Sequence, residues 1–332
     1  MNANSVSPFG RSTTFRVIAS DGVALVGDRG GNPSAPTIVL MHGGGQTRHS
    51  WETTMQGFVA LGYQVVNYDA RGHGESDWSS DAQYTFPRRV KDLANVLEKV
   101  DGPYALIGAS MGGITALQAL NEGMRPAAVV LVDIVLRPER SGVERIHAFM
   151  AGNAVGFANL DEAIAAVMAY NPNRPNPGDP NGLMRNLRLR PDGRLYWHWD
   201  PRMLPQDMDE DMAAIARIID GLMPANSVPT LLVRGGNSDL LTDANVAEFR
   251  RYLPHAEIHD VAGAGHMVAG DNNHTFMSGV GDFLARHLAV SAHNTRPAAA
   301  ARSSCHDRAS QLGQPDPYTW STRHDCKCIR SL

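Results

Sequence analysis

The chain has 332 residues, 43% of them hydrophobic and 19% charged, and it carries a formal charge of −4 at neutral pH. This composition is typical of a globular protein with one large core, or with a core and an inserted lid, and a negative charge without a basic stripe argues against nucleic-acid binding. No apolar run approaches the length of a membrane span and residues 1–5 lack the pattern of a secretory signal, so we expect a cytoplasmic protein.

Extended and helical segments alternate through the first part of the chain. Residues 14–20 and 23–28 predict a hairpin, and the apolar run 37–41 predicts a strand that is buried on both faces. Further strands are expected at 63–68, 104–107 and 127–133, and helices at 51–61, 86–100 and 113–120. This alternation predicts the α/β class, with a mostly parallel sheet that helices cover on both faces.

Glycines follow the buried strand 37–41, in the sequence His42-Gly43-Gly44-Gly45. Glycines just past the end of a strand allow backbone amides to turn toward a ligand, as one half of an oxyanion hole does. A tight turn without chemistry explains three glycines equally well. For His73, in a later glycine-containing loop, we expect a structural role.

A serine stands at the centre of a strand–turn–helix corner, in the sequence Gly108-Ala109-Ser110-Met111-Gly112. The pattern Gly-x-Ser-x-Gly in this context is typical of a nucleophile elbow, whose glycines permit a tight turn that holds the hydroxyl above the sheet. The amides at the start of the following helix point toward any negative charge that forms there. Ser110 is therefore the predicted nucleophile.

The alternation stops between residues 134 and 224 and resumes with a buried strand at 230–233. A segment that leaves the sheet and returns to it predicts a lid. Its aromatic and sulfur-containing side chains suggest an apolar acyl or aromatic pocket, with Trp197 and Trp199 as candidate substrate contacts, although packing among themselves explains any one of them as well. The other side chains of this set are Tyr196, Met150, Met168, Met203 and Met208, and His198 and Asp200 receive no role.

A helix at 245–252, a strand at 257–261 and a helix at 275–288 complete the core. The predicted division is therefore core residues 1–133 with a flexible beginning, a lid at 134–224, core residues 225–290 and a tail at 291–332. The tail lacks apolar periodicity and is expected to be disordered and dispensable. It contains all three cysteines, Cys305, Cys326 and Cys328, but not the full ligand set of a structural zinc site, so we expect no metal.

Hydrolysis by a serine needs a base to take its proton and a carboxylate to orient that base. Downstream of Ser110, Asp239 lies in a loop after the strand 230–233, and His266 lies in a glycine turn after the last strand. Open parallel sheets place their ligands beyond such strand ends, and the order serine, aspartate, histidine is that of a triad headed by an elbow. We therefore predict a triad of Ser110, Asp239 and His266.

A second carboxylate, Asp133, closes the strand that follows the elbow helix. Topology permits it as the triad acid, because both strands end at the same edge of the sheet. Asp133 runs directly into the apolar residues 134–136, whereas Asp239 lies in a flexible loop that can carry a carboxylate under the imidazole. This difference favours Asp239, and we expect Asp133 to support nearby loops by a hydrogen bond.

These motifs make residues 14–288 resemble the α/β-hydrolase superfamily, in particular its lidded esterase, epoxide-hydrolase-like and cofactor-free haloperoxidase-like branch. The resemblance rests on His42-Gly43, the loop from Asp69 to Ser76, the elbow and the turn that ends in His266. It implies an eight-stranded sheet with an inserted helical lid. It also maps the two amides of the oxyanion hole onto Gly44 and Met111. Epoxide hydrolases and haloalkane dehalogenases carry aspartate at the elbow, so a serine there implies an acyl-enzyme.

The resemblance implies hydrolysis of a carboxylic ester, thioester or lactone of an apolar or aromatic small molecule, with neither cofactor nor metal. His266 would take the proton of Ser110, and Asp239 would hold the tautomer of His266. Two alternatives use the same residues: a carbon–carbon bond hydrolase that acts on vinylogous diketones, and a perhydrolase. A third is a ligand receptor that keeps the hydrolase fold with little turnover, which an intact triad disfavours.

Overall fold

The computed structural model describes residues 12–170, 180–204, 207–222, 227–236, 241–264 and 268–290. The predicted tail with its cysteines lies outside these residues, as does most of the beginning that the sequence predicts to be flexible. Within the described part, no helix is long and apolar enough to cross a membrane.

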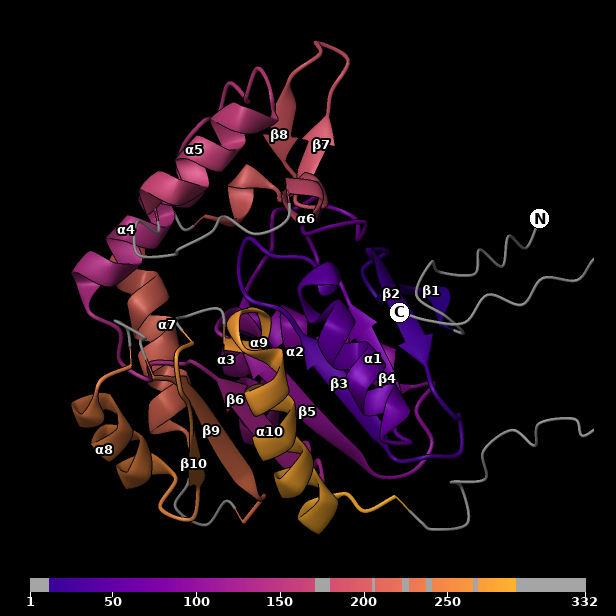
Figure 1. The fold of residues 1–332 in the computed structure, drawn as a ribbon. Helices are drawn as coiled ribbons and strands as arrows, with labels where there is room; N and C mark the ends of the chain where they lie inside the picture. Colours follow the sequence, from indigo (N-terminus) through magenta and orange to yellow (C-terminus); the bar gives the residue numbers. More distant parts are fainter. Residues whose placement is uncertain are drawn as a thin grey trace, which may run out of the picture. The chain divides into compact units, whose positions relative to one another are not determined.

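An eight-stranded sheet forms the centre of the molecule, in the order β1-β2-β4-β3-β5-β6-β9-β10 (Figure 1). Its strands are β1 (Thr13–Ile18), β2 (Ala24–Gly30), β3 (Thr37–Met41), β4 (Gln64–Tyr68), β5 (Tyr104–Ala109), β6 (Ala128–Val132), β9 (Thr230–Gly235) and β10 (Glu257–Val261). β2 pairs antiparallel with β1 and with β4, and the other neighbours are parallel. The α/β class and the mostly parallel eight-stranded sheet are thus confirmed.

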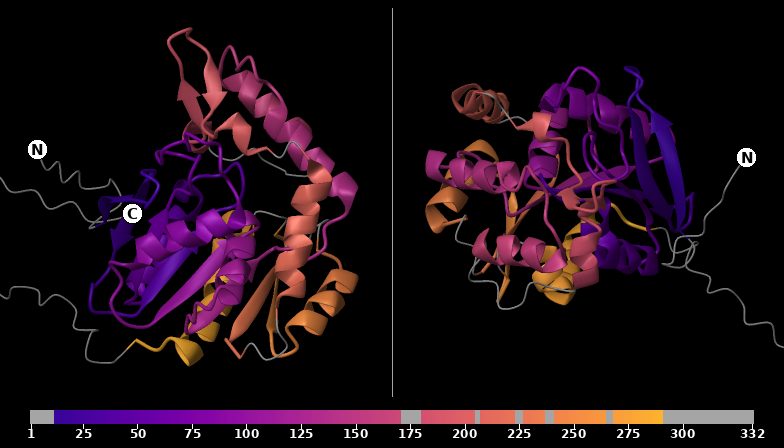
Figure 2. Two further views of the ribbon diagram at one scale, coloured as in Figure 1. Left: turned by 180° about the vertical axis from the view of Figure 1, so that it is seen from behind. Right: turned by 90° about the horizontal axis from the view of Figure 1, so that it is seen from above.

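Helices cover both faces of this sheet (Figure 2). They are α1 (Glu52–Ala60), α2 (Phe86–Leu97), α3 (Met111–Asn121), α8 (Asp243–Tyr252), α9 (Val268–Asp271) and α10 (Asn273–His287), with a short 3-10 helix η1 (Arg48–Trp51) before α1. Leu106 of β5 belongs to a core cluster that includes side chains of α2, α3 and α8, whereas its neighbour Ile107 belongs to a second cluster that includes side chains of α1 and α10. Because successive residues of a strand point to opposite faces, the continuous apolar runs in the sequence mark strands that are buried on both sides.

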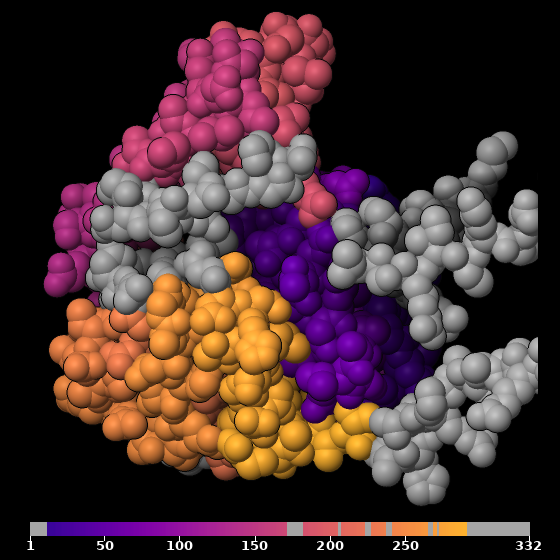
Figure 3. Space-filling view, in the orientation of Figure 1, coloured from indigo at the N-terminus to yellow at the C-terminus, as the bar shows by residue number. Residues whose placement is uncertain are grey.

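Between β6 and β9 the chain leaves the sheet and forms the inserted segment, a raised lobe in the space-filling view (Figure 3). Its elements are α4 (Arg140–Ala151), α5 (Leu160–Tyr170), α6 (Pro180–Met184), β7 (Leu187–Leu189), β8 (Leu195–Trp197), the 3-10 helix η2 (Pro201–Met203) and α7 (Met208–Asp220). Besides these helices the segment contains an antiparallel pair of short strands, β7 and β8, which the sequence did not predict. Strands of three residues are too short to leave a period in the sequence.

The inserted segment is tied to the core at the loop that follows β4. The Asp200 amide donates to the Gly72 carbonyl at 2.9 Å, and the Gly74 amide donates to Nδ1 of His198 at 2.7 Å. The Asp200 carboxylate also accepts from the Tyr84 hydroxyl. His198 and Asp200, which received no role from the sequence, therefore hold the segment on the sheet.

Candidate active site

Ser110 occupies a strained turn between β5 and α3, with φ of 46° and ψ of −114°. The flanking glycines make this turn possible. A Cβ on Gly108 would lie 2.4 Å from the carbonyl carbon of Gly112, and a Cβ on Gly112 would lie 2.4 Å from the carbonyl oxygen of Met41. Contacts this close exclude any side chain, so the close approach of β5 to α3 explains Gly108, and the packing of α3 against β3 explains Gly112.

The glycine loop after β3 lies beside the serine. A Cβ built on Gly43 would be 3.5 Å from the Cβ of Ser110. The loop closes on itself, because the Gly43 amide donates to the Gln46 side chain at 3.1 Å and the Gln46 amide donates to the Gly43 carbonyl at 3.2 Å. Gly44, at its apex, lines the same cavity as Ser110 and Met111. The structure thus brings these three predicted site residues together.

Two buried histidines connect the glycine loop to the loop after β4. Nε2 of His73 accepts from the Gly45 amide at 3.2 Å, and Nε2 of His42 accepts from the Ala70 amide at 2.9 Å. Each imidazole therefore carries its proton on Nδ1, where His42 donates to the Gly43 carbonyl at 2.8 Å. The structural role expected for His73 is thus to hold the backbone next to Ser110.

Ion pairs fix the rest of the loop after β4. Asp69 is fully buried, accepts from the backbone amide of Arg48 at 2.7 Å and pairs with the guanidinium of the same residue at 2.5 Å. Arg71 places its fork on Asp92, with both nitrogen–oxygen distances at 2.6 Å. These interactions explain why Asp69 and Arg71 can be buried in this loop, because a buried charge is stable only when it is paired and hydrogen-bonded.

A third buried imidazole, His198 of the inserted segment, lies 5.8 Å from the ring of His73, which is itself 5.0 Å from that of His42. Burial lowers the pKa of all three, that of His198 to about 3. All three rings are therefore neutral in the folded protein at neutral pH.

These three rings make stability strongly dependent on pH. Their pKa in the unfolded chain is about 6.5, so below that value the unfolded state binds more protons than the folded state, and the free energy of unfolding falls as the pH decreases. Three groups give a slope of up to about 4 kcal/mol per pH unit, large against a total stability of about 5–15 kcal/mol.

In urea unfolding curves measured between pH 6.5 and 5.5, where each imidazole of the unfolded chain is on average about three-quarters protonated, we expect a slope of about 3 kcal/mol per pH unit. In the His198→Gln variant the slope should decrease by about 1 kcal/mol per pH unit, the contribution of one imidazole. A wild-type slope smaller than that of a single proton would contradict neutral burial of the three rings.

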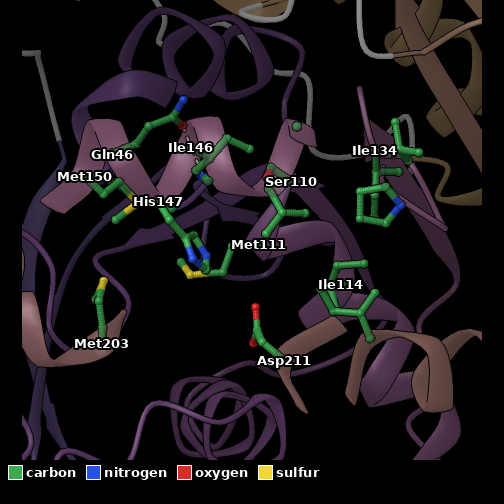
Figure 4. A pocket seen from close by; sticks show the side chains of 18 of the residues that line it. Gln46, Ser110, Met111, Ile114, Ile134, Ile146, His147, Met150, Met203 and Asp211 are labelled. Carbon is green, nitrogen blue, oxygen red and sulfur yellow. Dashed lines mark hydrogen bonds between the residues drawn. The ribbon is translucent and has the colours of Figure 1, made fainter. Parts of the chain in front are cut away.

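A cavity of about 1680 Å³ opens over Ser110, between the core and the inserted segment. Figure 4 shows Ser110 and Met111 facing it together with His147 of α4 and Asp211 of α7. Trp197 and Trp199, the candidate substrate contacts, are also among its lining residues. Their rings stack with centroids 4.7 Å apart, so they pack on each other and face the cavity at once.

Only some of the other aromatic and sulfur-containing side chains expected at the pocket line the cavity. Met150 and Met203 line the cavity, whereas Tyr196 does not, because neighbouring residues of β8 point in opposite directions. The Tyr196 hydroxyl instead donates to Asp192 at 2.8 Å. Met168 and Met208 do not line the cavity either, and Met168 is 50% exposed on α5.

Several cavity residues were not found from the sequence, namely Gln46, Arg89, Ile114, His147, Phe149 and Asp211. They come from five different elements or loops, so no local spacing connects them. A signal existed for Arg89. Its position, four residues before Leu93 and seven before Val96, places it on the apolar stripe of an amphipathic helix.

Of the three predicted triad residues, Asp239 and His266 lie outside the described residues. The alternative acid, Asp133, is 2% exposed, has a φ of 46° and lines the cavity. Its Oδ1 accepts from the Gly235 amide at 3.4 Å, at the end of β9. This contact is of the supporting kind expected for Asp133.

Comparison with known proteins places this arrangement among hydrolases. A model of the alpha/beta hydrolase family matches residues 38–278. Esterase Rv0045c of Mycobacterium tuberculosis is 32% identical over 253 residues, which cover 72% of this chain and 79% of that protein. The sn-1-specific diacylglycerol lipase ABHD11 of Mus musculus is 31% identical over 269 residues, covering 77% and 83%. A solved structure of the Mycobacterium tuberculosis esterase has a TM-score of 0.66 at 28% identity, covering 84% of this chain and 93% of that chain.

Proposed function

The chain belongs to the alpha/beta hydrolase family, and on that premise we propose that it hydrolyses a carboxylic ester through an acyl-enzyme on Ser110. The strained elbow carries this proposal, because it presents a serine to a large cavity directly beside a glycine loop. Two relatives at about 30% identity, named as an esterase and a lipase, support ester cleavage.

In the proposed reaction, Oγ of Ser110 attacks the ester carbonyl while His266 takes the proton of the Ser110 hydroxyl. The amides of Gly44 and Met111 stabilise the tetrahedral oxyanion, and Asp239 orients the imidazole. The alcohol leaves with the proton from His266. Water then gives a proton to His266 and attacks the acyl-enzyme, which releases the acid and restores the serine.

The inserted segment serves as the lid that selects the substrate. The lid side of the cavity is mainly aromatic and aliphatic, with Trp197, Trp199, Phe149 and two methionines among its lining residues. Such a surface favours an ester with an apolar or aromatic part, since burial of apolar area contributes about 25 cal/mol per Å².

Steady turnover of p-nitrophenyl esters with acyl chains of increasing length tests this proposal. We expect many equivalents of p-nitrophenol per enzyme, and stoichiometric labelling by a fluorophosphonate. Release of one equivalent or less at all chain lengths would contradict the proposal and favour a receptor. Hydrolysis of vinylogous diketones without turnover of esters would instead favour the carbon–carbon bond hydrolase.

A further inference from the structure

Arg89 is a buried cation in the wall of the proposed active-site cavity. It is the fourth residue of α2, at the end of the first turn, and α2 packs against the elbow helix α3. Arg89 is 7% exposed, and it lines the same cavity as Ser110, Met111 and Ile114. Arg89 is therefore part of the wall of the cavity that contains the serine.

This guanidinium has no hydrogen-bonding or ion-pair partner among the described residues. No hydrogen bond or ion pair joins its side chain to any of them, and its buried Nε atom is without an acceptor. The Phe86 ring lies below it, 5.6 Å from ring centroid to guanidinium carbon. Arg71 shows the contrast, since it is buried even more completely, at 1% exposed, but holds Asp92 with both arms of its fork.

Nearby carboxyl groups do not neutralise Arg89. Asp92 is occupied by Arg71, and no ion pair joins Arg89 to Asp211 of α7. Burial raises the pKa of Asp211, and burial lowers the pKa of Arg89 to about 10. Arg89 is therefore still charged at neutral pH, and such a group destabilises the fold unless an anion binds it.

We propose that Arg89 binds a carboxylate of the substrate, so that the preferred ester carries a free carboxyl group as well as the scissile bond. This inference rests on the proposed ester hydrolysis and names its substrate class. The planar fork of arginine matches a carboxylate, with which it makes two parallel hydrogen bonds. A single anionic charge fits better than a phosphate dianion, because the two acidic neighbours Asp92 and Asp211 would repel additional negative charge.

Binding to an inactive protein tests this inference separately from catalysis. In the Ser110→Ala background, titration calorimetry compares the monomethyl esters of succinate, glutarate and adipate with their dimethyl esters. We expect at least one monoester to bind roughly 10–100-fold more tightly than its neutral counterpart, the range for a hydrogen-bonded charge. Acetoxy acids, with the carboxylate in the alcohol part, identify which side of the ester Arg89 faces.

Two further substitutions in the Ser110→Ala protein test whether Arg89 causes the tighter binding of the monoesters. Arg89→Met should bring the ratio of anionic to neutral binding close to one. Arg88→Met is the matched control, because Arg88 neighbours it on the same helix but pairs with Asp21 at 3.2 Å, and this variant should keep the ratio. Arg89→Met should also raise the Tm by a few degrees, because an apolar side chain then replaces an unpaired buried charge.

Equal binding of charged and neutral esters by the parent protein, or an unchanged ratio in Arg89→Met, would overturn the inference. A lower Tm for Arg89→Met would likewise indicate that the guanidinium serves the fold. Inorganic phosphate that competes as strongly as the monoesters would exclude the carboxylate as the specific anion. If the monoesters bind through Arg89 but the wild-type protein turns over no ester, the proposed function fails and the anion site stands.

Discussion

Replacing Ser110 by alanine is expected to reduce kcat for p-nitrophenyl esters by about 10⁵–10⁶-fold, the loss seen when other triads lose their nucleophile. The fold should be unaffected, because the substitution removes only Oγ and leaves the strained backbone with a Cβ of the same size. The Tm should therefore stay within about 2 °C of the wild-type value. Steady-state kinetics and thermal melts of the two proteins provide the measurement.

Ser141 supplies the matched control, since it lies on α4 and also lines the cavity. The Ser141→Ala variant should keep both its esterase activity and its labelling by a fluorophosphonate, whereas Ser110→Ala should lose both. Labelling of Ser110→Ala at the wild-type level would show that another residue is the nucleophile.

Replacing Asp239 by asparagine should lower kcat by about 10⁴-fold, because an amide in place of the carboxylate selects the wrong tautomer of the catalytic histidine. Asp133→Asn should cost far less activity. The asparagine side-chain oxygen can still accept from the Gly235 amide, so the loops at the ends of β6 and β9 stay connected. Any effect of Asp133→Asn should appear mainly as a lower Tm.

The kinetic comparison of these two variants decides which carboxylate is the triad acid. Both should be measured with the same ester at saturation, since the difference is expected in kcat. A large loss of kcat in Asp133→Asn with near-normal activity in Asp239→Asn would assign the acid to Asp133. Its position at the cavity makes this outcome geometrically possible.

The order of the elements and the position of the nucleophile could be predicted from the sequence, because both have local causes. Each buried strand is a continuous apolar run, because a strand that is covered on both faces buries the side chains of all its residues. The elbow is recognisable because the close approach of β5, α3 and β3 excludes side chains at Gly108 and Gly112. Apolar runs and glycine motifs of this kind can be recognised from a few neighbouring residues.

The tertiary structure alone decided which distant side chains meet. Nothing in the spacing of the sequence connects His73 with the Gly45 amide, or Arg89 on α2 with the cavity under α7. The pair β7-β8 could not be predicted, because strands of three residues are too short to show an alternation of apolar and polar residues. The direction of Tyr196, which lies in β8, could not be predicted for the same reason. Local patterns determine which element forms, whereas the packing of one element on another determines what its side chains touch, and this packing depends on the whole core.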